Sequence, residues 1–202
     1  MMNIVYKTAL ILLVVGMSTM TFGQEKYLFY PKISIDAPGK HFSEMSLEGV
    51  HKNTNTGITA ALEVITKPVF YNMSFGGGIS YQFARKLDVE NYQGFQFATV
   101  YGIVKYRALQ FAGIECSVLG NLGYNGIFGG IGNYSTYSVD GVDMAYTLLG
   151  GLYYAGGVRF DKDIYFFEAV YKQYGGTASS TTFNYKAAIH YTTVSFSIGV
   201  LI

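Results

Sequence analysis

Hydrophobic and polar residues alternate with a period of two along much of the chain. The clearest run is Val69–Phe83, with the sequence VFYNMSFGGGISYQF. Every second residue from Val69 is apolar except for one glycine, and the residues between them are polar or very small apart from Phe70. This period predicts a β-strand whose two faces lie in different environments.

Similar alternation recurs through the rest of the chain and predicts eight strands. They are expected at residues 42–51, 57–66, 69–84, 92–107, 109–120, 145–160, 163–174 and 189–202. Several reach the 9–11 residues that a tilted strand needs to cross a bilayer, and the longest exceed the usual strand of about 5–6 residues. In the strand at 92–107, Phe97, Tyr101 and Ile103 share one face.

The expected connections alternate between long and short. The short ones are Thr66–Pro68, Arg107–Leu109 and Asp161–Asp163, and the long ones are His51–Thr56, Lys86–Asn91, Asn121–Met144 and Gly175–Ala188. This alternation is typical of an up-and-down barrel with short periplasmic turns and longer extracellular loops. The sequence therefore predicts an all-β fold, a single up-and-down antiparallel eight-stranded transmembrane β-barrel over residues 42–202.

The N-terminal segment has the pattern of a cleaved secretory signal peptide over residues 1–23. Lys7 is its only charged residue, Ala9–Val15 is apolar, and Thr21 and Gly23 offer small residues before the expected cut. The apolar run is shorter than the roughly 20 residues of a membrane-spanning helix. Residues 24–41 contain two prolines and are expected to form a periplasmic segment or an extension of the first strand.

Composition supports a lipid-facing surface. The chain is 50% hydrophobic and 13% charged, with 19 Tyr and 15 Phe, whereas soluble domains carry about 25% charged residues. With Lys7 removed, 13 basic residues stand against 13 acidic ones, which gives no indication of a nucleic-acid partner. After the signal segment no run of 18 apolar residues occurs, and this excludes a helical inner-membrane protein.

The signal segment, the alternating segments and the closing stretch Thr193–Ile202 (TVSFSIGVLI) together resemble small outer-membrane barrels of the OmpA-like and PorT-like kind. The resemblance covers residues 42–202 and is one of architecture. It implies a location in the outer membrane, contact with outer-membrane lipid, and a structural, adhesive or accessory role, secretion-associated or otherwise, without enzyme activity. Such barrels usually end in an aromatic residue, whereas this chain ends in Ile202.

The interior of an eight-stranded barrel is filled by side chains. By the alternation, several charged residues point inward and form a structural polar network. Its predicted members are Glu48, Glu63, Glu115, Arg159, Glu168 and Lys172. An ion path or a paired-carboxylate site is the functional alternative for the same residues.

The segment Asn121–Met144 is the predicted recognition loop. Its aromatic residues are Tyr124, Phe128, Tyr134 and Tyr137. Tyrosine among Gly, Asn and Ser resembles recognition surfaces, so a protein or surface ligand is the expected partner, and a loop without a partner is the alternative. No cofactor or metal is expected, because the His residues are scattered and two loop aspartates are too few for Ca²⁺.

Aromatic residues at the strand ends predict two interfacial belts. The extracellular belt would hold Tyr81, Tyr92, Tyr146, Tyr171, Tyr174 and Tyr191, and the periplasmic belt Tyr71, Tyr106, Phe111, Phe160 and Tyr165.

Two other classes of protein stay open at this stage. A soluble periplasmic lipocalin-like barrel would place its apolar face inward around a ligand. A lipid-modifying barrel enzyme would bring His190 together with a serine such as Ser179 and an acidic group such as Glu168.

Overall fold

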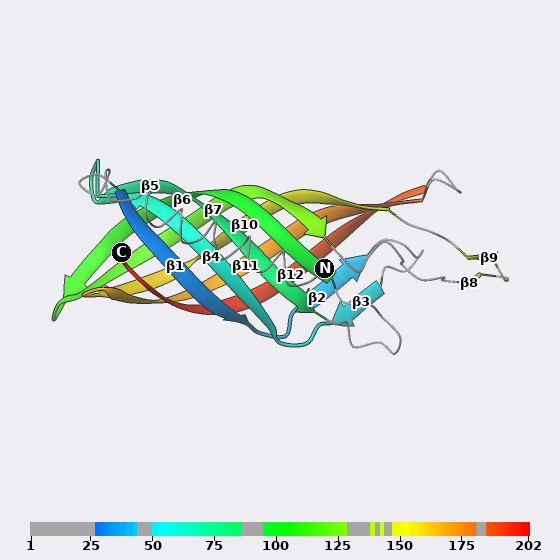
Figure 1. The fold of residues 1–202 in the computed structure, drawn as a ribbon, viewed down its shortest axis with the longest axis horizontal. Coiled ribbons are helices and arrows are strands. Elements are labelled where there is room, and N and C mark those ends of the chain that lie inside the picture. The colour runs from blue at the N-terminus through cyan, green and yellow to red at the C-terminus, as the bar shows by residue number, and fades with distance from the viewer. Residues whose placement is uncertain are drawn as a thin grey trace, which may run out of the picture.

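The main body of the protein is a closed antiparallel barrel (Figure 1). The computed structural model describes residues 27–43, 50–85, 95–128, 138–139, 142–143, 147–180 and 185–202. Eight strands form the wall: β1 (Tyr27–Asp36), β4 (Gly57–Thr66), β5 (Met73–Arg85), β6 (Phe95–Phe111), β7 (Ile114–Phe128), β10 (Thr147–Lys162), β11 (Tyr165–Ser180) and β12 (Tyr185–Val200). Each pairs with the next, and β1 pairs with β12. The predicted up-and-down barrel is confirmed.

Four further strands are short. β2 (Lys40–Ser43) pairs with β12 beyond the end of β1, and β3 (Val50–Asn53) pairs with β2, so both extend the sheet of the wall. β8 (Ser138–Val139) and β9 (Val142–Asp143) pair with each other within the connection between β7 and β10. Among the described residues no helix has the length and apolar character needed to cross a membrane.

The two ends of the barrel differ in their connections. At the end called here the turn end, short turns join β4 to β5, β6 to β7 and β10 to β11, and β1 begins beside the end of β12 (Figure 1). Left-handed backbone at Ala112 and Gly113 (φ 51° and 78°) closes the tightest turn, and Asp163 (φ 54°) closes the turn between β10 and β11. That turn was expected at Asp161–Asp163 but falls at 163–164, because β10 continues to Lys162. The opposite end, with β2, β3, β8 and β9, is called the loop end.

The first wall strand is not the expected segment 42–51 but β1, so the wall begins at Tyr27. The expected strand is replaced by the short β2 and β3, and residues 44–49 lie outside the described part of the chain. Pro31 interrupts the segment in sequence, yet β1 carries it within a continuous pairing to β4. The reason lies in the alternation: Tyr30, Lys32, Ser34 and Asp36 are buried while Ile33 and Ile35 are exposed.

Several residues that were expected in turns or loops belong to strands instead. Instead of a turn, Arg107–Leu109 holds a register shift in the β6–β7 pair, and the turn follows at Ala112–Gly113. An extra residue of this kind breaks the period of two and so imitates a turn in sequence. At the loop end β7 continues to Phe128, and β11 and β12 continue to Ser180 and from Tyr185, so the expected loops there are shorter.

The outer face of the wall is apolar. Ile33, Ile79, Val100, Leu122 and Ile198 are each between 57% and 68% exposed and belong to five different strands. Inward positions hold the charged, hydroxyl and amide groups together with large aromatic residues. The face of β6 that carries Phe97, Tyr101 and Ile103 is buried, so its aromatic side chains fill the lumen rather than contact lipid.

The two predicted aromatic belts have different outcomes. All five residues of the turn-end set are exposed. Of the loop-end set, Tyr81 and Tyr171 are exposed, whereas Tyr174 and Tyr191 are buried in the lumen. Tyr92 and Tyr146 lie outside the described residues.

Candidate functional site

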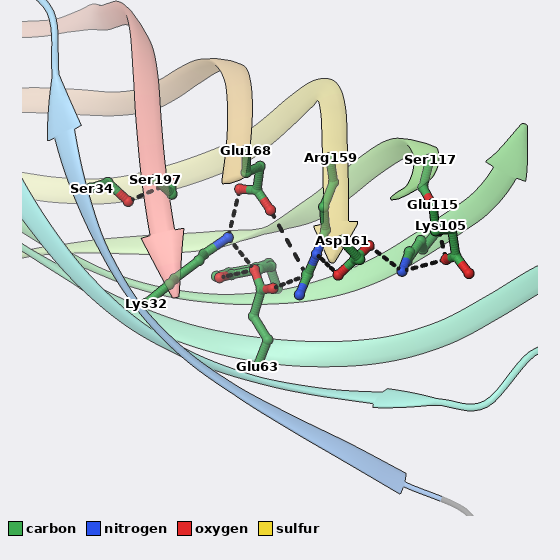
Figure 2. A network of polar contacts seen from close by, with 11 residues as sticks. Lys32, Ser34, Glu63, Lys105, Glu115, Ser117, Arg159, Asp161, Glu168 and Ser197 are labelled. Atoms are coloured by element: carbon green, nitrogen blue, oxygen red, sulfur yellow. Dashed lines mark hydrogen bonds and ion pairs between the residues drawn. The ribbon is translucent and has the colours of Figure 1, made fainter. Parts of the chain in front are cut away.

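Four charged side chains from four strands meet in the middle of the lumen (Figure 2). This central cluster consists of Lys32 on β1, Glu63 on β4, Arg159 on β10 and Glu168 on β11. Lys32 Nζ lies 2.5 Å from Glu63 Oε1 and 2.7 Å from Glu168 Oε1. Arg159 Nη1 lies 3.4 Å from Glu63 Oε2 and 3.9 Å from Glu168 Oε2. Two cations thus balance two carboxylates, as buried charge requires.

Arg159 joins this cluster to aromatic side chains and to the turn end. Its guanidinium carbon lies 4.0 Å from the ring centroid of Tyr30 and 3.7 Å from that of Phe166. Such contacts place the cation against the negative faces of the rings. Its Nε donates to Asp161 Oδ1 at 3.0 Å. The side chain is fully buried, so charge partners and rings replace water around the guanidinium.

A second cluster lies at the turn end and shares Asp161 with the first (Figure 2). Lys105 Nζ lies 2.8 Å from Asp161 Oδ2 and 2.9 Å from Glu115 Oε1. Arg107, which is partly exposed, lies 3.4 Å from Glu115 Oε2. The carboxylates here are also matched by cations, so charge is neutralised locally along the lumen.

A smaller ion pair occupies the loop-end part of the lumen. Lys172 Nζ on β11 donates to Asp36 Oδ1 on β1 at 3.2 Å, and Thr59 Oγ1 donates to Asp36 Oδ2 at 2.5 Å. Both charged side chains are nearly fully buried.

An aromatic layer fills the lumen between the central cluster and the loop end. Tyr101 donates from its hydroxyl to Glu63 Oε1 at 2.9 Å and packs against Tyr153, with ring centroids 5.5 Å apart. Tyr153 contacts Tyr174 at 5.0 Å. Tyr174 stacks on Phe97, at 4.8 Å, and on Tyr191, at 5.6 Å, and these two rings lie 6.0 Å from each other. The five rings are buried and come from four strands, so together they fill the lumen between the ion cluster and the loop end.

A cavity of about 280 Å³ lies at the turn end. Tyr30, Ile65 and Phe166 supply apolar lining, and Lys105, Glu115 and Asp161 supply charged lining. The buried Arg159 side chain lies against two of these rings, so the cavity is bounded by the central cluster on its inner side.

The structure places five of the six predicted network residues in the lumen. Glu63, Arg159 and Glu168 meet in the central cluster, Glu115 belongs to the turn-end cluster, and Lys172 pairs with Asp36. Glu48 lies outside the described residues.

Sequence reasoning missed Lys32, Asp36, Lys105 and Asp161, two cations and two carboxylates that pair with the predicted residues. The signal was present in the alternation. A period of two places Lys105 on the same face as the buried Ile103, and Asp161 on the same face as Arg159.

The predicted recognition residues do not share one loop. Tyr124 lies on β7, where its outward side chain is 60% exposed between the buried Asn125 and the inward Gly123. Phe128 is the last residue of β7, so the assignment of both residues to a loop is wrong. Asparagine and glycine gave this stretch a loop-like composition, but small and polar residues are also what the lumen face of a barrel strand needs. Tyr134 and Tyr137 lie outside the described residues.

The residues considered for a hydrolytic site lie on opposite faces of the wall. His190 is exposed and stacks on Phe42, with ring centroids 6.4 Å apart, whereas Glu168 is buried in the lumen. Within the described residues, no group of three or more His, Cys, Asp or Glu side chains has an arrangement that could hold a metal ion.

No protein-family model matches the chain, and no curated protein matches it in sequence. Among solved structures, it is similar to the outer membrane protein OprG from Pseudomonas aeruginosa, with a TM-score of 0.52 and 9% identity over 88% of this chain and 95% of that one. It is also similar to Neisserial surface protein A (NspA), with a TM-score of 0.46 and 12% identity over 86% of this chain and 96% of that one. At these identities the likeness is one of fold.

The fold and the chemistry of its two faces define the class of protein. A closed barrel satisfies all of its backbone hydrogen bonds within the wall, the condition for a sheet to span lipid. Its exterior is apolar, and the buried charges of the described residues, apart from Arg85, form ion pairs in the lumen. The chain is an integral outer-membrane β-barrel protein.

Proposed function

We propose that this protein is a non-conducting outer-membrane barrel with a structural or accessory role at the cell surface, in which recognition belongs to the loop end. The observation that carries the proposal is the filled lumen. Ion clusters and five packed aromatic rings occupy it in succession, and nearly all of these side chains are buried. A wall of eight strands leaves little room beyond such a filling.

The orientation follows from the difference between the two ends. Outer-membrane barrels have short periplasmic turns and longer extracellular connections. The turn end would then face the periplasm, and the loop end, with the β2–β3 and β8–β9 pairs, would face the outside. Recognition residues are more often carried by such connections than by the wall itself.

The arrangement of charge disfavours a soluble lipocalin-like barrel. That class would enclose its apolar face around a ligand and expose charged residues to water. Here most of the large apolar residues of the wall are exposed, while Lys32, Glu63 and Glu168 are buried. The separation of His190 from Glu168 by the wall likewise disfavours a hydrolase that uses both, and a non-enzymatic role fits the geometry better.

Conductance measurements test the closed lumen. The purified protein, reconstituted in planar lipid bilayers, should give no stable ion-conducting steps. The double variant Tyr174→Ala/Tyr191→Ala removes two rings of the aromatic layer and should show raised ion leakage. It is the matched control, because its leakage shows that the protein inserts into the bilayer. Stable conductance of the unaltered protein would contradict the proposal.

A loop replacement tests where recognition lies. β7 ends at Phe128 and β10 begins at Thr147, so residues 129–146 can be replaced by a short Gly/Ser link without shortening the wall. The variant should insert and keep its heat resistance, but lose the adhesion to cells or matrix that the intact protein confers on the bacterium. Full adhesion by the inserted variant would place recognition elsewhere.

A further inference from the structure

The strand β12 changes its partner part of the way along its length. Toward the turn end it pairs with β1, as far as Ser195 opposite Asp36. Toward the loop end it pairs with β2, from Thr192 opposite Lys40. Between these pairings the regular strand structure is interrupted at two corners, residues 37–39 before β2 and residues 54–56 before β4. Backbone bonds continue there, from Ala37 N to Val194 O and from Thr54 N to Gly39 O. The β2–β3 pair is therefore held at the loop end by its pairing with β12 and by these two corners.

One side chain from a third strand bonds both corners. Arg85, the last residue of β5, donates from Nη2 to Ala37 O at 2.8 Å and to Asp36 O at 3.4 Å. Its Nε donates to Asn55 O at 3.0 Å, and its Nη2 also bonds that oxygen. The guanidinium carbon lies 5.1 Å from the ring centroid of Tyr191 on β12. Arg85 thus connects β5, both corners and β12.

An irregularity in β5 turns Arg85 toward the lumen. The pairing with β6 shifts register between Gln82 and Arg85, both of which are buried at 1% exposure, while Phe83 between them is 49% exposed. Without this shift, a residue three positions after the inward Gln82 would point toward lipid. Bulges commonly re-aim a side chain in this way.

The neighbouring chain leaves room for this side chain. Gly57 begins β4, and a Cβ atom added there would lie 2.6 Å from Arg85 Nε and 2.7 Å from its Cδ. Glycine at this position therefore permits the close approach of Arg85 to the corner at Asn55.

Arg85 differs from the other buried cations in its partners. No carboxylate in the described part of the chain forms an ion pair with it, whereas Lys32, Lys105, Arg159 and Lys172 each have at least one. Its partners are backbone carbonyl oxygens and an aromatic ring. Its removal would release the corners without leaving a buried carboxylate unpaired, so the consequence should stay local.

We infer that Arg85 is a latch that fixes the β2–β3 pair on the loop end of the barrel, and that the wall does not require it. The corners also bond each other, through Gly39 N to Thr54 Oγ1 at 2.9 Å and Thr54 N to Gly39 O at 3.0 Å. Arg85 adds the connection from these corners to β5. The inference adds to the proposed function a means of holding a surface element in one position, and it rests on geometry that is independent of any ligand.

Amide hydrogen exchange in reconstituted protein tests the latch. Arg85→Met should accelerate exchange of the amides in Lys40–Ser43 and Val50–Asn53 by at least about tenfold, which corresponds to about 1.4 kcal/mol of lost protection. Exchange in the wall pairs of β10 and β11 should stay unchanged. Gln82→Met is the matched control, since Gln82 is equally buried on the same strand and has no hydrogen bond to either corner.

Gly57→Ala provides a second route to the same result, because it displaces the Arg85 side chain without removing it. It should also accelerate exchange in β2 and β3. Unchanged exchange in both variants, with the barrel folded, would overturn the latch. Loss of the folded barrel in Arg85→Met would overturn the claim that the contact is local. Neither result depends on adhesion, so failure of the latch is distinguishable from failure of the proposed function.

Discussion

Two arginines are almost fully buried in this barrel, and their surroundings differ in kind. Arg159 lies among Glu63, Asp161 and Glu168 and between two aromatic rings. Arg85 has backbone carbonyl oxygens and one ring as its partners. A carboxylate that loses its cation leaves an unpaired charge in a low-dielectric interior, whereas a carbonyl oxygen that loses its donor carries no formal charge. The same residue type is therefore expected to support the whole wall at one position and a local element at the other.

The largest effect is expected from Arg159→Met. The central cluster would keep one cation, Lys32, for two carboxylates, and breaking a buried ion pair by removing one partner costs about 3–5 kcal/mol. The unfolding free energy, measured by urea titration in lipid vesicles with heat-dependent gel mobility as the readout, should fall by this amount, or the barrel should fail to assemble.

The double variant Arg159→Met/Glu168→Gln is the control for that result. It removes one cation and one carboxylate together, so the cluster is again balanced, and part of the lost stability should return. If the double variant is no more stable than Arg159→Met, loss of packing between the Tyr30 and Phe166 rings, rather than unpaired charge, explains the effect.

A third arginine placed on either face of β5 sharpens the comparison. Ile79 is exposed on the lipid face, and Ser80 points into the lumen. Ile79→Arg should lower stability by about 2–4 kcal/mol, the cost of an arginine facing lipid near the midplane. Ser80→Arg should be better tolerated, although it crowds its neighbours. Assembly yields in the outer-membrane fraction measure the order, and the reverse order would show that the assigned faces are inverted.

The order of these effects rests on features that alternation alone could reveal. Glu63, Arg159 and Glu168 were assigned to the lumen because a period of two fixes the face of every residue in a regular strand. The fold class and a turn at Asp163 could be predicted in the same way, since wall strands and hairpin turns are local patterns.

Pairing between distant strands could not be read in the same way. Lys32 and Glu168 are 136 residues apart, and their contact depends on barrel closure and on the register of two strand pairs, β1–β12 and β11–β12. β1 was missed because Pro31 suggested a break, although the adjacent strand pairings continue past it. Arg85 was missed for a further reason: the register shift before it reverses the face that the period of two would assign.

A smaller effect is expected from glycines on the two faces of the wall. A Cβ added at Gly78 would lie 2.7 Å from Tyr101 Cζ, the ring that bonds Glu63, whereas one added at Gly120 would meet no atom within 4 Å. Gly78→Val should therefore cost about 1–3 kcal/mol through overpacking. Gly120→Val on the lipid side should leave the unfolding free energy unchanged or slightly raised. If Gly78→Val lowers the unfolding free energy no more than Gly120→Val does, the lumen around Arg159 and Glu63 is loosely packed.

The smallest effect on global stability is expected from Arg85→Met. The variant loses hydrogen bonds to carbonyl oxygens at the loop end, each of which contributes about 0.5–1.5 kcal/mol, but it also removes the cost of burying a cation without a carboxylate. The net change in unfolding free energy should therefore be about 1 kcal/mol or less, in the same urea titration that is used for Arg159→Met. The comparison of the two arginines fails if both substitutions destabilise the barrel equally. It is sharpened if Arg85→Lys, which keeps the charge but offers one nitrogen in place of the guanidinium fork, behaves like Arg85→Met, because the geometry of the donors rather than the charge would then hold the corners in place.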